Sequence, residues 1–86
     1  MAESVPVWLV ERTYSDDEQN LLIVTYATED GERMLRKERA MTSFDDARSP
    51  VAPREDADES ELRPVTDQET REWYKSEVAR TQRERT

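Results

Sequence analysis

The residues of this sequence with the most obvious capacity for chemistry are its carboxylates. Ten of the 21 lie in three runs, at residues 16–18, 45–46 and 55–61. Paired carboxylates can bind Mg²⁺ or Ca²⁺, or act as acid and base in glycoside hydrolysis. The segment that starts at Asp56 has Asp58 and Ser60 at positions of a calcium-binding EF-hand loop. It has Glu61 where that loop requires glycine and Asp67 where it requires glutamate, so the match fails. We therefore interpret the acidic runs as solvated surface and expect no metal site and no cofactor.

The sequence offers little else to a catalytic mechanism. It contains no histidine and no cysteine, which removes the usual general base, the imidazole ligand, disulfides and a thiolate metal site. A single glycine excludes a glycine-rich phosphate loop. Lys37 and Lys75 could formally activate a serine or threonine, but no motif frames either lysine. We expect a protein without catalytic activity.

A basic stretch is the main alternative indication of function. Its cationic residues are Arg33, Arg36, Lys37 and Arg39. The aromatic residues expected beside it are Trp8, Tyr14 and Tyr26. A basic patch with aromatic residues can bind single-stranded nucleic acid. Strand alternation splits the cluster, because Arg36 points to the face opposite the other three cations, which share theirs with Leu35. We prefer a structural interpretation, in which these side chains form ion pairs with Glu11 and Glu38 and protect an edge strand from aggregation.

The charge of the chain indicates where it works. Twenty-one acidic residues stand against thirteen basic ones, and the formal net charge is −8. Only Lys37 and Lys75 are lysines; the other basic residues are arginines. Self-repulsion destabilises such a compact domain in dilute buffer, whereas at molar salt the Debye length falls to about 3 Å and screens it. We expect a halophilic protein of a cytoplasm rich in potassium chloride. The N-terminal apolar run is too short for a signal peptide, and no stretch reaches the roughly 20 residues of a membrane helix.

Three blocks divide the chain, which we expect to form one domain. Residues 1–43 hold nearly all the aliphatic content and are predicted to form a three-stranded antiparallel β-meander. Residues 44–64 are predicted to be an acidic connector that contains proline and alanine. Residues 65–86 are predicted to form a C-terminal helix. The predicted fold class is α+β, with the helix packed on one face of the sheet.

A hairpin turn fixes the predicted register of the meander. Its strands are expected over residues 5–14, 21–28 and 32–40. Asp30-Gly31 contains the only glycine and suits a type I′ turn, in which both central residues have positive φ. The turn predicts four cross-strand pairs: Ala27 with Met34, Tyr26 with Leu35, Val24 with Lys37 and Leu22 with Arg39.

Both faces of the predicted sheet carry apolar side chains. In the second strand, Leu22, Val24 and Tyr26 point to one side, while Leu21 and Ile23 point to the other. A meander with one solvated face should alternate between apolar and polar residues, so we expect both faces to be covered. One helix covers one face. The other face requires either residues 44–64, whose large apolar residues are Phe44, Val51 and Leu62, or a second copy of the chain. We expect the second copy, because so few hydrophobic residues in that segment bury little. The candidate contact residues of this homodimer are Trp8, Val10, Leu22, Val24, Tyr26 and Leu35.

The predicted helix begins with a capping box. Thr66 is the expected N-cap, and Glu69 follows three residues later. One narrow apolar stripe runs along the helix, formed by Thr70, Trp73, Tyr74, Val78 and Thr81. Trp73 and Tyr74 are expected to dock the helix onto its own sheet, because without them the helix has almost nothing to bury.

The segments VWLVERTY, LLIVTYATEDGERMLRKE and RPVTDQETREWYKSEVAR resemble those of small acidic uncharacterised proteins of haloarchaea. The resemblance covers most of the chain except residues 44–60. It implies a salt-rich habitat and a β-meander with a helix, and it implies no activity. We predict a non-catalytic interaction module that self-associates, and another protein is the second candidate partner. The alternative is a small nucleic-acid-binding regulator that uses Arg33, Lys37 and Arg39.

Overall fold

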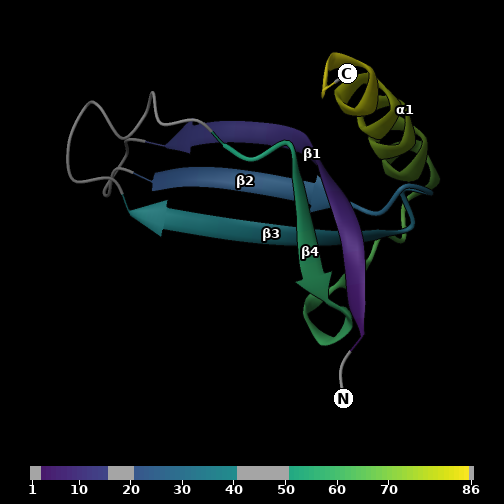
Figure 1. Ribbon diagram of the computed structural model, residues 1–86, viewed down its shortest axis with the longest axis horizontal. Coiled ribbons are helices and arrows are strands. Elements are labelled where there is room, and N and C mark those ends of the chain that lie inside the picture. Colours follow the sequence, from purple (N-terminus) through teal and green to yellow (C-terminus); the bar gives the residue numbers. More distant parts are fainter. Residues whose placement is uncertain (1–2, 16–20, 41–50, 86) are drawn as a thin grey trace.

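The protein is an α+β domain with one antiparallel sheet and a single C-terminal helix in the part of the chain that the structure describes. This structure is a computed structural model and describes residues 3–15, 21–40 and 51–85. The elements are β1 (Ser4–Ser15), β2 (Leu21–Ala27), β3 (Arg33–Ala40), β4 (Arg54–Asp58), the 3-10 helix η2 (Glu59–Glu61), β5 (Arg63–Pro64) and α1 (Gln68–Arg85). Figure 1 shows the three long strands side by side, with α1 beside the end where β2 turns into β3. The predicted fold class is confirmed.

The prediction of three strands is wrong, because the described sheet has five strands in the order β4-β1-β2-β3-β5. Both additional strands come from the segment that we expected to be a connector. β4 has the sequence REDAD, in which only Ala57 is buried, so no apolar alternation marks it as a strand. It is held by antiparallel pairing with the N-terminal part of β1, from Ser4↔Asp58 to Trp8↔Arg54. Backbone hydrogen bonds to another strand, which leave no signal in side-chain patterning, determine this element.

The β2–β3 hairpin has the predicted register and a different turn. All four predicted pairs, from Ala27↔Met34 to Leu22↔Arg39, are present. Gly31 has φ +73°, but no other described residue has positive φ, so the turn is not type I′. The Thr28 carbonyl instead accepts from the Gly31 N–H at 2.8 Å, and Thr28 and Arg33 close a four-residue loop. The register survives because a four-residue loop and a two-residue loop with the same centre pair the same residues.

Gly31 is also the point at which the turn touches the helix. A Cβ atom on this residue would lie 2.4 Å from the Arg71 carbonyl oxygen of α1. A side chain at this position is therefore excluded both by the backbone conformation and by the approach of the helix.

The core consists of two clusters, one on each face of the sheet. On the helix side, Val10 and Ala27 of the sheet pack with Val65, Tyr74 and Val78. On the opposite side, the buried residues are Val7, Leu22, Val24, Tyr26, Leu35 and Ala57, with Leu9, Val51 and Leu62 packed against them. The two-sided sheet is confirmed. The second cluster is covered within one chain by the segment from residue 51 to residue 62, whereas we expected a second copy to cover it.

The N-cap of α1 is Asp67, one residue later than predicted. Its Oδ2 accepts from the Thr70 backbone N–H at 2.9 Å and from the Thr70 hydroxyl at 2.8 Å. These hydrogen bonds to the charged form lower the pKa of Asp67, and the Arg71 charge adds to the effect. An ionised carboxylate is a stronger acceptor than the Thr66 hydroxyl and also complements the helix dipole, which explains the position of the cap.

Candidate interaction site

The two outer strands cover only part of the long strands beside them. β4 pairs with Ser4–Trp8 of β1, and β5 pairs with Arg33 and Met34 of β3. In the described part of the chain, no strand pairs with the outer side of β1 after Trp8 or of β3 after Met34. An unpaired edge presents a row of N–H and C=O groups to any partner that can add a strand. The structure therefore offers two candidate sites for association, here named the β1 edge (residues 9–15) and the β3 edge (residues 35–40).

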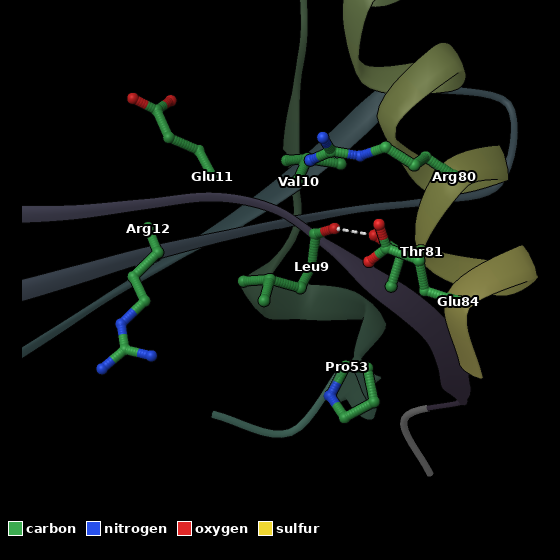
Figure 2. A pocket seen from close by; sticks show the side chains of 8 residues that line it. All are labelled: Leu9, Val10, Glu11, Arg12, Pro53, Arg80, Thr81 and Glu84. Carbon is green, nitrogen blue, oxygen red and sulfur yellow. Dashed lines mark hydrogen bonds between the residues drawn. The ribbon is translucent and has the colours of Figure 1, made fainter. Parts of the chain in front are cut away.

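The β1 edge is closed at its beginning by groups of the same chain. The Leu9 N–H donates to the Pro53 carbonyl at 2.9 Å, and the Leu9 carbonyl accepts from the Thr81 hydroxyl at 2.7 Å. The pairing of β1 with β2 shifts register between Leu9 and Glu11, which marks a β-bulge. Figure 2 shows Arg80 extending from α1 toward Val10, and Glu11 and Arg12 pointing to opposite sides of the strand. A bulge and a helix together deter the addition of another strand at this edge.

The β3 edge is regular, and its exposed backbone groups can be assigned from the ladder. The Arg33 carbonyl accepts from the Thr28 N–H at 3.0 Å, so the backbone groups of Arg33 face β2. The Glu32 carbonyl faces outward and accepts from the Val65 N–H at 2.8 Å. Because β3 has no register shift against β2, this alternation continues along the strand. The N–H and C=O groups of Arg36, Glu38 and Ala40 therefore point away from the sheet.

The side chains of the β3 edge carry charges of both signs. Arg36 and Glu38 lie on the helix side of the sheet, form an ion pair at 3.0 Å, and are each about half exposed (54% and 52%). Lys37 lies on the opposite side and is paired with Glu55 of β4. Surface pairs of this kind contribute little to the stability of the fold. The order of these charges along β3 instead decides which strands can approach the edge without electrostatic repulsion.

The predicted contact residues are placed mainly inside the chain. Five of them are buried, with exposures of 2–8%: Val10, Leu22, Val24, Tyr26 and Leu35. Trp8 is partly buried, and Arg54 lies over its ring at 5.7 Å from the centroid. Leu22, Val24, Tyr26 and Leu35 share one cluster, whereas Val10 belongs to the other. Five of these six residues therefore belong to the core of a single chain, and a surface for a partner would be built mainly from other groups.

The predicted nucleic-acid residues share one side of β3 and are not free cations. The pairs Lys37↔Val24 and Arg39↔Leu22 place both cations on the face of the second core cluster, as predicted. Lys37 is bonded to Glu55, and Arg33 lies 3.8 Å from a carboxylate oxygen of Glu59. The carboxylates of the former connector thus neutralise two of the three positions.

The exposure of Trp73 is the feature that the helical pattern did not predict. Tyr74 is buried, with 6% of its surface exposed, and docks the helix as expected. Trp73 is 45% exposed and leans on Tyr74 at 5.2 Å between ring centroids, so the prediction that it docks on the sheet is wrong for this residue. The stripe is narrower than the wheel indicates, because Tyr74, Val78 and Thr81 suffice to cover the bulged part of β1.

Comparison with known proteins gives the chain a family. A family model matches residues 1–86, and its description is a family of unknown function, DUF7967. The chain belongs to this family. No curated protein and no solved structure matches it. Membership in DUF7967 carries no activity, so the site has to be judged by its geometry.

The pKa shifts of Tyr26, Asp30 and Asp58 in this DUF7967 protein arise from burial and from local hydrogen bonds within the fold. Burial is the main cause that raises the pKa of Tyr26 to about 12, and the charge of Glu55 adds to it. The hydroxyl of Tyr26 stays protonated and donates to the Ala52 carbonyl at 2.9 Å. Hydrogen bonds from Thr28 and Glu32 lower the pKa of Asp30 in the hairpin turn, and those from Ser60 lower the pKa of Asp58. Each shifted carboxyl receives local hydrogen bonds, as expected for turns and caps.

The described residues form neither a cluster of metal ligands nor a helix that could span a membrane. Within residues 3–15, 21–40 and 51–85, no three metal-ligating side chains lie close enough together to hold an ion. The described helix α1 is not apolar enough to cross a membrane.

Proposed function

We propose that this protein is a non-catalytic interaction module that self-associates in a salt-rich cytoplasm. The observation that carries the proposal is the β3 edge, where the outward backbone groups of Arg36, Glu38 and Ala40 have no strand partner among the described residues. A strand added there would extend the sheet without rearranging the core. The proposal moves the contact surface from the faces of the sheet, which the chain covers itself, to its edge.

Composition supports the salt-rich setting. A formal charge of −8 on 86 residues opposes the approach of two copies in dilute buffer. At molar KCl, screening removes most of this repulsion, while hydrogen bonds between strands are little affected. Self-association should therefore strengthen as KCl rises.

The test is the solution mass of the intact chain, measured by light scattering in molar KCl across a range of protein concentrations. A dimer supports the proposal. A monomer at the highest soluble concentration, with circular dichroism that shows a folded chain, overturns it. The same circular dichroism series at low KCl tests the salt dependence of the fold, which we expect to gain structure toward molar KCl.

Nucleic-acid binding stays the alternative, and the ion pairs do not favour it. The groups that would bind phosphate, Arg33 and Lys37, already face Glu59 and Glu55. Retention on single-stranded RNA that is lost in the Arg33/Lys37/Arg39 triple alanine variant would favour this function over ours.

A further inference from the structure

We propose that two copies of the chain pair their β3 strands antiparallel about a two-fold axis at Lys37, so that Arg36 of each copy faces Glu38 of the other. This inference rests on the proposed self-association and specifies its geometry. It follows from the direction of the backbone groups and from the order of charges on the β3 edge.

The backbone sets the first condition. In an antiparallel ladder, residues that exchange both hydrogen bonds must each point toward the other strand. Arg36 and Glu38 both point outward, so either can face the other in the partner strand. The shared ladder spans residues 35–39 of each copy, because Ala40 would face Met34, which is already paired with Arg63 of β5. Lys37 points inward, and on the axis it falls at the position between two hydrogen-bonded pairs, where no interstrand bond is required.

The charges favour this register over the two registers whose axis lies one residue to either side. Shifting the axis to Arg36 sets Arg36 against itself, and shifting it to Glu38 sets Glu38 against itself. Like charges directly opposite each other destabilise a ladder, whereas opposite charges stabilise it. The axis at Lys37 gives two Arg36–Glu38 contacts on the helix side of the joined sheet. Charges protect many edges from pairing, but here Arg36 and Glu38 have opposite signs and lie on the same side, which makes the edge complementary to itself.

The lysines on the axis are balanced within each copy. The two Lys37 side chains would meet on the other side of the sheet, where like charges repel. Each is already bonded to Glu55 of its own chain, so the group at the axis holds two ammonium and two carboxylate charges. Lys37 and Glu55 are 49% and 29% exposed, and the pair can form on the surface of the single chain before the strands meet.

A single cysteine tests the register, because the natural chain has none. In Lys37→Cys the two Cα atoms across the axis would lie about 4.5 Å apart, within the range of a disulfide. Arg39→Cys is the matched control on the same strand and the same side. Its two copies would be offset by four residues, or about 13 Å, which is too far for a disulfide. Under mild oxidation we expect a covalent dimer for Lys37→Cys and none for Arg39→Cys.

A charge exchange gives a second measurement that needs no cysteine. Arg36→Glu alone places Glu opposite Glu, and Glu38→Arg alone places Arg opposite Arg. We expect each variant to self-associate roughly tenfold more weakly than the natural chain at moderate salt. An equimolar mixture of the two should form heterodimers with both contacts restored, which native mass spectrometry can distinguish from homodimers.

The outcomes separate the two proposals. Cross-linking at residue 37 and pairing of the mixed charge variants support the register. A dimer in light scattering that cross-links at residue 39, or whose charge variants do not prefer each other, overturns the register and leaves self-association intact. A monomeric natural chain overturns both.

Discussion

The two exposed edges of this sheet differ in how the chain treats them. At the β1 edge the Leu9 N–H and carbonyl bond to Pro53 and to Thr81, and a bulge interrupts the strand immediately afterwards. At the β3 edge the strand is regular, β5 stops after two residues, and the side chains alternate in charge. Among the described residues, the chain closes the start of the β1 edge and leaves the β3 edge suitable for a second strand. A small domain can therefore protect one stretch of a sheet edge against the addition of another strand and leave a different stretch unprotected. The unprotected stretch is then a candidate site for a partner strand.

Proline substitutions on β3 should have the largest effect, because they separate the side of the strand that faces β2 from the side that faces outward. The N–H of Lys37 faces β2 and that of Glu38 faces outward. Lys37→Pro removes a ladder hydrogen bond and should lower the free energy of unfolding by about 2–3 kcal/mol. Glu38→Pro should keep the fold and abolish self-association, since proline is tolerated at an edge but cannot donate. Thermal unfolding and light scattering of both variants check this, and equal loss of stability in the two would contradict the assigned backbone directions.

Thr81→Val should open the β1 edge at its closed end. The substitution keeps the shape of the side chain and removes the hydroxyl that donates to the Leu9 carbonyl. Thr81 is only 9% exposed, so the carbonyl loses a partner in a region with little access to water, at a cost of about 1–2 kcal/mol in unfolding free energy. Denaturant unfolding measures the loss, with Thr81→Ser as the control that retains the hydroxyl. If the serine variant is as unstable as the valine variant, packing and not the hydrogen bond is responsible.

Tyr26→Phe should loosen the segment that closes the β1 edge. The phenol donates to the Ala52 carbonyl, next to Pro53, which accepts from Leu9. Its loss should cost about 1 kcal/mol of unfolding free energy near neutral pH.

The same variant should change the alkaline stability curve. The pKa of Tyr26 is raised from 10.0 to about 12 in the folded chain, so the folded state favours the protonated phenol. Its stabilising contribution is complete below pH 10 and is lost as the pH rises from 10 to about 12. Unfolding at several pH values should show a steeper decline for the natural chain than for Tyr26→Phe. Parallel curves would show that the phenol does not carry the effect.

Glu55→Ala should give the smallest effect, and only on association. The Lys37–Glu55 pair is on the surface, so its loss should change the unfolding free energy by less than about 1 kcal/mol. In the dimer it leaves two lysines facing each other, and we expect association to weaken a few-fold at low salt. Because molar KCl screens the repulsion, the difference should disappear there. A difference that persists in molar KCl would place Lys37 away from the axis.

Sequence patterning predicted the central part of this fold well. The register from Ala27↔Met34 to Leu22↔Arg39 was predicted because one Asp-Gly pair centres the hairpin and alternation fixes the faces. The helix was found from its cap region and from its stripe, with the N-cap displaced by one residue because Thr66 and Asp67 are both good caps. The exposed Trp73 was assigned wrongly, because a helical wheel shows which residues share a stripe and not how wide a stripe the sheet can accept.

The candidate site could not be predicted in the same way. β4 has one buried apolar residue in five, so its position depends on the hydrogen bonds that the N-terminal part of β1 offers. Once residues 51–62 cover the second core cluster, four of the proposed contact residues become interior: Leu22, Val24, Tyr26 and Leu35. The β3 edge is then the available surface among the described residues, and this follows from the short pairing of β5, which is only two residues long.

The fold class, the central hairpin register and the helix could be predicted because they depend on local turn preference and on periodicity. The lack of histidine and cysteine chemistry follows from composition. Three features follow from the tertiary structure: residues 51–62 cover the second face, Thr81 closes the start of the β1 edge, and no described strand pairs with β3 after Met34. The physical reason is that these features are backbone hydrogen bonds and contacts between residues distant in sequence. Such interactions depend on which strands lie side by side. Side-chain patterning predicts which face of a strand is buried, but it does not predict which strand pairs with it.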